Sequence, residues 1–170
     1  MHHSPHLKKV FQDQLKNKEQ LRFPFGMHEP EVVDLLIQWF YSAQLEIPNE
    51  VSNGEDIVRN HIKLWVLANY LDIPDLENQC IYVMEQVHQH TGIAYTSSLE
   101  WLWANTKPGA LRSYWVDKCC STKSGSFARE AENLPKEMLI EILDTIADRK
   151  DVRDVLLTYN PTAYMEKYYV

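Results

Sequence analysis

The sequence is poor in the residues that build disulfide-linked or nucleotide-binding folds. It has only three cysteines, Cys80, Cys119 and Cys120. An odd count leaves one thiol over, and the vicinal pair could bridge only with strain. The five glycines are scattered singly, so there is no glycine-rich phosphate loop, and neither a G-x-S-x-G nor an H-E-x-x-H motif occurs. These absences exclude a disulfide framework and argue against an enzyme that binds nucleotides. They also indicate that the protein is found in a reducing compartment.

Positive charge is also in short supply. There are 17 Lys and Arg against 24 Asp and Glu, which gives a net charge of -7. A phosphate backbone or an anionic lipid surface is therefore a poor partner. The mean hydropathy of -0.40 and the lack of a long apolar run argue against a membrane span, and Met1–Pro5 does not begin a signal peptide. We expect a cytoplasmic or nuclear protein with no nucleic-acid or membrane partner.

What the sequence does contain is a series of short helical patterns, with prolines where helices begin or end. Apolar residues recur at helical spacing from Pro30 to Phe40 and from Ile57 to Leu71. Pro74 then opens the next helix, so we expect two helices to meet at a tight corner and share one core. Apolar residues alternate with other residues from Leu21 to Phe25, as in a short strand. Because proline has no N–H to donate, Pro24 fits only if this is an edge strand or if Pro24 stands at the end of the strand.

The second half continues in the same way. Ser97 and Glu100 have the spacing of a capping box ahead of a short helix, and Pro108-Gly109 separates that helix from the next. Pro135 opens a regular amphipathic helix. For residues 151–170 we expect a short helix and a loosely held tail.

Catalytic and metal-binding chemistry is weakly represented. His88 and His90 could join Cys80 as metal ligands, but residues two apart on a helix point to different sides, and no C-x-x-C completes a zinc site. Cys119 or Cys120 could act as a nucleophile with a histidine, although a half-buried thiol at a helix end is the commoner situation. The prediction is no cofactor and no metal.

The five tryptophans fit a core better than a ligand site, with one exception. Trp101, Leu102 and Trp103 are consecutive, so their three side chains cannot all face the core. One of the two tryptophans is therefore expected at the surface, and Trp101 is our candidate for a partner contact.

The order of these elements resembles the BTB/POZ domain. The resemblance is carried by five stretches: Ser4–Leu7, Val10-Phe11, Leu21–Phe25, Glu29–Ser42 and Leu64–Cys80. The last stretch follows the family pattern L-x-x-L-A-x-x-L-x-I-P-x-L-x-x-x-C. This resemblance implies a non-enzymatic module that binds other proteins.

Two later stretches, Asn105–Arg112 and Leu134–Leu139, are similar to the helical extension of BTB proteins in filamentous fungi. We therefore predict a BTB/POZ-like domain at residues 1–92 and a helical extension at 93–170. The predicted fold class is α+β and predominantly helical, a truncated BTB/POZ-like fold.

The sequence departs from the family in two ways. The strands and first helix that precede the Ser-Pro element in the family are missing, so the Leu21–Phe25 edge should be uncovered and the chain should self-associate. Family members that recruit a cullin often carry a hydrophobic-x-Glu motif where this chain has Leu15-Lys16-Asn17. Asn17 has no carboxylate, which weakens a cullin partner.

The resulting prediction is a protein-protein interaction module, either an adaptor or a self-association domain. The alternatives are a substrate adaptor of a cullin-type ubiquitin ligase and a small cysteine-dependent cytosolic enzyme. The predicted partner is another protein, either a different one or a second copy of this chain. The candidate contact residues are Phe11, Leu15, Asn17, Phe23, Phe25 and Trp101.

Overall fold

The computed structural model describes four residues near the N-terminus and four longer segments: Lys9, Gln12, Asp13, Lys16, and residues 28–47, 53–121, 134–148 and 168–169. Within these residues the fold is entirely helical, which confirms the predominantly helical prediction. The predicted strand Leu21–Phe25 lies outside the described residues, so the β component stays a prediction.

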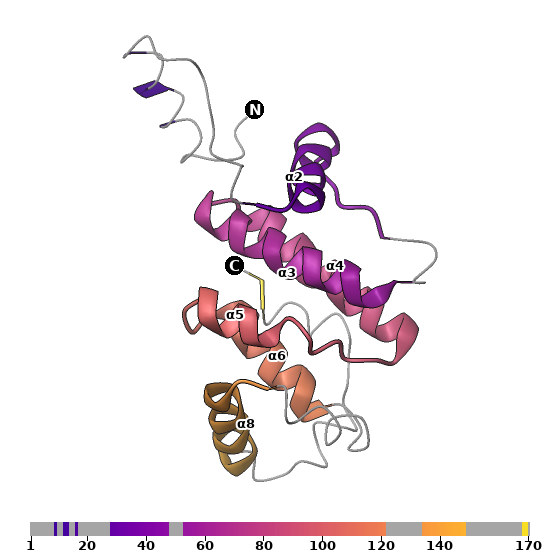
Figure 1. The fold of residues 1–170 in the computed structure, drawn as a ribbon, viewed down its shortest axis with the longest axis vertical. Coiled ribbons are helices and arrows are strands. Elements are labelled where there is room, and N and C mark those ends of the chain that lie inside the picture. Colours follow the sequence, from indigo (N-terminus) through magenta and orange to yellow (C-terminus); the bar gives the residue numbers. More distant parts are fainter. Residues whose placement is uncertain are drawn as a thin grey trace.

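Figure 1 shows the helices stacked from one end of the molecule to the other. Helix α2 packs on α3, α3 pairs with α4, α5 lies against α3, and α6 packs on α8 at the far end from α2. The described helices are α2 (Pro30–Ser42), α3 (Gly54–Tyr70), α4 (Pro74–Thr91), α5 (Leu99–Asn105), α6 (Ala110–Ser121) and α8 (Lys136–Asp148). None of these helices has the length and apolar character that crossing a bilayer requires.

The predicted corner between α3 and α4 is confirmed, and its geometry explains its sharpness. Asp72 adopts the left-handed conformation with φ 56°. Its N–H donates to the carbonyl of Asn69 at 3.2 Å, and the N–H of Ile73 donates to Ala68 at 3.0 Å. This pair of bonds is the Schellman arrangement that ends a helix. Pro74 starts α4 immediately afterwards, so the two helices must fold back on each other.

A single hydrophobic core runs through all six of these helices. Trp39, Trp65 and Met84 are buried in it together, as predicted. The same core contains Trp115 of α6 and Met138 of α8, so the C-terminal helices share it. Trp103 is buried as well, with 7% of its surface exposed, whereas Trp101 is 37% exposed. The prediction that one of these two tryptophans is at the surface is confirmed.

The predicted capping box is wrong by one residue. Helix α5 starts at Leu99 with Ser98 as its N-cap, and no side chain caps it. The N–H of Leu102 donates to the Ser98 carbonyl at 2.9 Å, so Ser98 takes the place predicted for Ser97. Glu100 then falls too early in the first turn for the reciprocal bond of a capping box.

The ends of the C-terminal region also differ from expectation. In α8, which was predicted to be amphipathic, Met138 and Ile142 are buried, but the apolar residues Leu143 and Ile146 are 66% and 46% exposed. The predicted loose tail is wrong at Tyr168, which is buried and donates a hydrogen bond to Asp117 of α6. The predicted short helix in residues 151–167 lies outside the described residues.

Glu77 of α4 is a buried carboxyl beside the α3–α4 corner. Asn69 donates to both of its oxygens, at 3.3 and 3.4 Å. Burial, and to a smaller degree the charge of Asp72, raise the pKa of Glu77 from 4.5 to about 7, with the Asn69 bonds opposing them. The unfolded carboxyl ionises first, so the stability contributed by the protonated form is present below pH 4.5 and lost as the pH rises to 7.

Glu77→Gln should therefore stabilise the protein more at pH 8 than at pH 5, because the amide mimics the neutral carboxyl. We expect a difference of about 1 kcal/mol, reduced from the full linkage by partial solvation. Urea unfolding at both pH values measures it. Glu137→Gln, at an exposed position of α8, should give the same change in stability at both. A Glu77→Gln effect that is larger at pH 5 would contradict the assignment.

Candidate functional site: the exposed faces of α2 and α5

Helix α2 is apolar on two sides. Its inner side, Val32, Leu36 and Trp39, is at most 2% exposed. Burying each such side chain contributes about 1.5–3 kcal/mol, which anchors α2 to the core. Beside this row lies a second one, formed by Ile37, Phe40 and Tyr41, which are 45%, 39% and 90% exposed. We call Ile37, Phe40 and Tyr41 the α2 outer face.

The α2 outer face is held in place from behind. The Phe40 ring meets the edge of the buried Trp39 ring, with centroids 5.7 Å apart and planes at 63°. The helix ends just after Tyr41, where Ala43 adopts φ 56° and its N–H donates to the Trp39 carbonyl at 2.7 Å. The face is therefore a set of apolar side chains on a rigid helix, as an interface needs.

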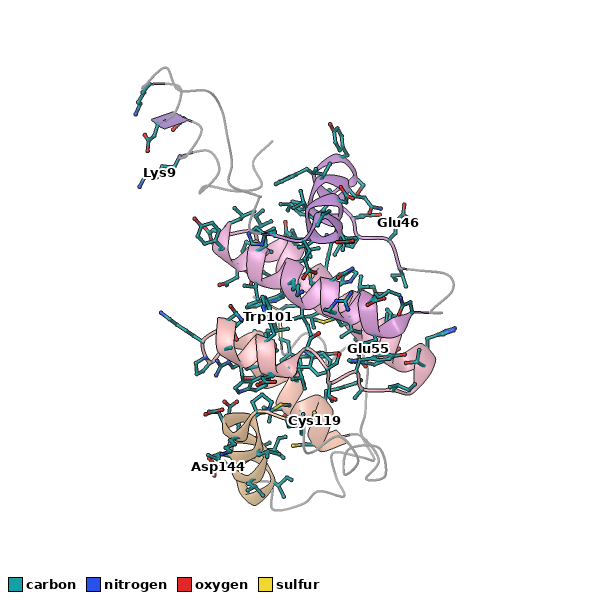
Figure 2. The ribbon with its side chains drawn as sticks, in the orientation of Figure 1. Lys9, Glu46, Glu55, Trp101, Cys119 and Asp144 are labelled. Atoms are coloured by element: carbon teal, nitrogen blue, oxygen red, sulfur yellow. The ribbon has the colours of Figure 1, made fainter. Side chains whose placement is uncertain are left out.

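Trp101 belongs to a second exposed area, on α5 beside α3 (Figure 2). The ammonium of Lys63 lies 5.6 Å from its ring centroid, and Lys63 also forms an ion pair with Glu29, the residue before α2. The tryptophan is thus oriented by a cation, and part of its surface remains open to solvent. Its predicted role as a partner contact stays a prediction.

The other predicted contact residues cannot be placed. Phe11, Leu15, Asn17, Phe23 and Phe25 lie outside the described residues, and the cullin prediction depends on two of them, Leu15 and Asn17. The exposed pair Phe40 and Tyr41 was not predicted, because the helical spacing of the apolar residues from Pro30 to Phe40 does not separate buried positions from exposed ones. The sequence did carry a signal: the seven apolar residues from Val32 to Phe40 are more than one buried row needs.

The thiols and histidines are distributed as structural groups. Cys80 and Cys119 are buried and Cys120 is half-buried, and none of these three cysteines is in a disulfide. Burial raises the pKa of the Cys80 thiol, with the charge of Glu77 adding to it, which disfavours the reactive thiolate. His88 is buried and His90 exposed, so the two do point to different sides. Among the described residues no three His, Cys, Asp or Glu side chains could hold a metal ion.

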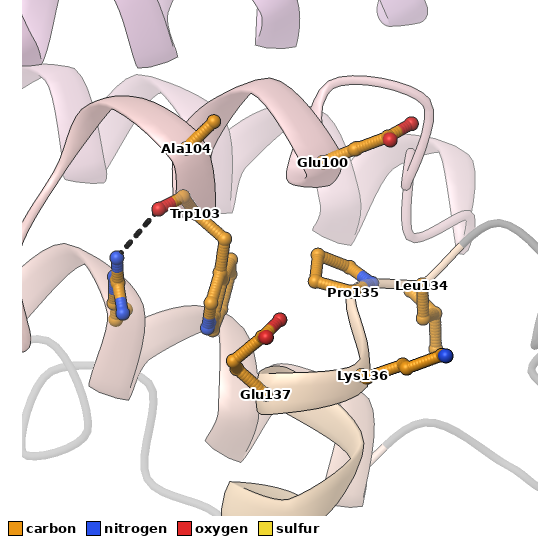
Figure 3. Close-up of a pocket in the computed structure, with 8 residues that line it drawn as sticks. Glu100, Trp103, Ala104, Leu134, Pro135, Lys136 and Glu137 are labelled. Atoms are coloured by element: carbon orange, nitrogen blue, oxygen red, sulfur yellow. Dashed lines mark hydrogen bonds between the residues drawn. The ribbon is translucent and has the colours of Figure 1, made fainter.

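A cavity of about 550 Å³ lies where α5, α6 and the start of α8 meet (Figure 3). Its one arginine, Arg112, lies 5.2 Å from the Trp103 ring centroid and donates to the Trp103 carbonyl at 2.7 Å. Arg112 also donates to the hydroxyl and the carbonyl of Thr106. Trp103 Nε1 donates to Glu141 of α8 at 3.3 Å. These polar groups are engaged with one another, so this region joins three helices.

The comparisons with known proteins identify the family of the chain. The family model of the BTB/POZ domain matches residues 1–88 of the 170-residue chain, ending within α4. No curated protein and no solved structure matches the chain. BTB/POZ domains are in general protein-protein interaction modules, not enzymes. The match spans more than half of the sequence, and the chain belongs to the BTB/POZ domain family.

Proposed function

We propose that this chain is a non-enzymatic adaptor that binds a second, different protein through the α2 outer face. The observation that carries the proposal is the exposure of Ile37, Phe40 and Tyr41 on a helix whose adjacent row, Val32, Leu36 and Trp39, is buried. An apolar face of this kind gains free energy when it is removed from water, at roughly 25 cal/mol per Å², offset by the entropy of association.

Charge favours a basic partner over a second copy. The chain carries a net charge of -7, so two copies repel each other. Glu31 and Asp34 are exposed on α2 next to the outer face. A basic, amphipathic segment could place apolar side chains on the outer face and cations beside these carboxylates. The three free thiols suit a reducing compartment such as the cytosol or nucleus.

The test compares two double variants by affinity purification and quantitative mass spectrometry. Ile37→Ser/Tyr41→Ser removes the α2 outer face, and Ile140→Ser/Leu143→Ser removes equally exposed apolar side chains from α8. We expect the first variant to lose specific partners at least tenfold and the second to keep them, because truncating a central interface anchor costs about 2 kcal/mol or more. Both should fold, since these side chains are exposed.

Two results would overturn the proposal. Recovery of the same proteins with the α2 variant would exclude this face as the binding site. A dimer that forms with rising concentration in analytical ultracentrifugation, and that the α2 variant abolishes, would identify a second copy as the occupant. Monomeric wild type with α2-dependent partners supports a heterotypic adaptor.

A further inference from the structure

A cavity of about 460 Å³ lies between the C-terminal end of α2 and the first half of α4. Helix α4 lines it with four side chains, Asp75, Asn78, Gln79 and Tyr82. Their spacing of three, four and seven residues from the first places them in one row along the helix. The lining also includes Trp39, Ala43 and Tyr169. The cavity therefore combines residues of α2, of α4 and of the segment 168–169.

Hydrogen bonds hold the walls of this cavity in place. Gln79 Nε2 donates to the carbonyl of Ala43 at 3.0 Å, and the N–H of Leu45 donates to Gln79 Oε1 at 2.8 Å. These two bonds tie the chain that follows α2 to α4. Tyr168 is buried and donates a hydrogen bond to α6, which limits where the adjacent Tyr169 can lie. The cavity is therefore preformed, as binding sites commonly are.

The exposed side chains of the lining are aromatic and negatively charged. Tyr82 and Tyr169 are 40% and 44% exposed. Helical side chains lean toward the N-terminal end of their helix, so Tyr82 leans toward Asp75. Asp75 is exposed, and within the described part of the chain no lysine, arginine or histidine forms an ion pair with it. Two accessible tyrosines and a carboxylate without a salt bridge thus line one cavity.

This combination favours a cation that also has a flat surface. A tyrosine ring attracts a cation over its face, and a carboxylate accepts hydrogen bonds from a cationic donor. A guanidinium group can do both at once, because its face stacks on a ring while its edge donates two parallel hydrogen bonds to a carboxylate. A lysine ammonium is more strongly hydrated and has no flat face. A metal ion is a poor match, since no cluster that could hold one occurs among the described residues.

We propose that this cavity receives the guanidinium group of an arginine from the partner protein. The group donates to the carboxylate of Asp75 and lies against the rings of Tyr82 and Tyr169. The inference rests on the proposed function, because it names a basic side chain of the same partner. Trp39 lines the cavity, and its ring also contacts Phe40 of the α2 outer face, with centroids 5.7 Å apart. The outer face and the cavity are therefore neighbours, and one basic segment can contact both.

The test titrates the full ¹⁵N-labelled chain with N-acetyl-arginine amide and follows amide resonances by NMR. We expect saturable shifts in α4 between residues 75 and 82 and at residue 169. N-acetyl-citrulline amide, which has a similar shape without the charge, should cause no saturable shift there. Equal shifts with both probes, or arginine shifts that do not saturate at these residues, would overturn the proposal.

Two variants separate the contacts. Tyr82→Leu removes the ring face and Asp75→Asn removes the charge, and each should weaken arginine-amide binding about twofold to fivefold. Both side chains are exposed, so both variants should fold. The matched controls Tyr70→Leu and Asp144→Asn change exposed residues that do not line the cavity, and should leave binding unchanged (Figure 2). Equal weakening by a variant and its control would show attraction to the surface in general and refute the site.

The titration is separate from the test of the proposed function. It needs no partner protein, and the α2 double variant leaves every lining residue of this cavity unchanged. Loss of partners in the double variant, together with an arginine titration that does not saturate, would refute the cavity and leave the α2 outer face as the binding site.

Discussion

Lys118→Met should lower the free energy of unfolding by about 3–5 kcal/mol, because it leaves a buried carboxylate without its cation. Glu85 of α4 has no exposed surface, and Lys118 of α6 donates to its two oxygens at 3.0 and 2.8 Å. Tyr114 and Gln89 donate to the same carboxylate at 3.2 and 3.1 Å. Neither of these neutral donors can replace the positive charge, so the variant must bury the Glu85 carboxylate without the Lys118 ammonium or protonate it.

Urea unfolding at pH 7 measures this loss, and two further variants locate its cause. Glu85→Gln/Lys118→Met removes both charges and keeps an acceptor for Tyr114, so it should recover most of the stability. Lys107→Met, at an exposed position, should stay within about 0.5 kcal/mol of wild type. A single variant as stable as the double variant would mean that the charge of Glu85 is not buried as described.

The position of this ion pair matters for the architecture. Glu85 lies in the segment that matches the BTB/POZ family, and Lys118 lies beyond it. The pair therefore joins the family domain to its C-terminal helices across the shared core. The predicted boundary after residue 92 separates the BTB/POZ-like stretch of the sequence from the helical extension. The Glu85–Lys118 ion pair connects the two sides of that boundary.

Local chemistry made the helices and the α3–α4 corner predictable. Pro30, Pro74 and Pro135 mark helix starts because proline lacks the N–H that a first turn does not use. The residues Asp72-Ile73-Pro74 predict the end of one helix and the start of the next without any tertiary information. The capping box failed for the opposite reason: Ser97 and Ser98 are both good N-caps, and the packing of α5 decides between them.

The buried polar contacts between helices could not be derived from spacing. Glu85 and Lys118 are 33 residues apart, and their pairing depends on how α6 packs on α4. The sequence still carried a trace of it, because Glu85 and His61 interrupt apolar stripes that are otherwise buried. A charged or titratable residue inside such a stripe predicts a buried polar partner, or a ligand, without identifying it.

Acid should destabilise the protein through His88, next to the same ion pair. His88 donates from Nδ1 to the hydroxyl of Tyr114 at 2.9 Å, and that hydroxyl donates to Glu85 at 3.2 Å. Nε2 is left without a partner. Burial, with the charge of Lys118 adding to it and that of Glu85 opposing, lowers the pKa of His88 from 6.5 to about 3. The folded ring stays neutral while the unfolded ring takes up a proton.

The stability contributed by neutral His88 is therefore complete above pH 6.5 and is lost as the pH falls toward 3. Between pH 7 and pH 5 this single group should cost about 2 kcal/mol. His88→Gln, which can still donate to Tyr114, should remove that part of the acid dependence. Urea unfolding of the variant and of wild type at the two pH values measures the difference in the free energy of unfolding. His90→Gln, exposed on the same helix, should leave it in place. If His88→Gln lost stability on acidification as steeply as wild type, the acid dependence between these pH values would not come from His88.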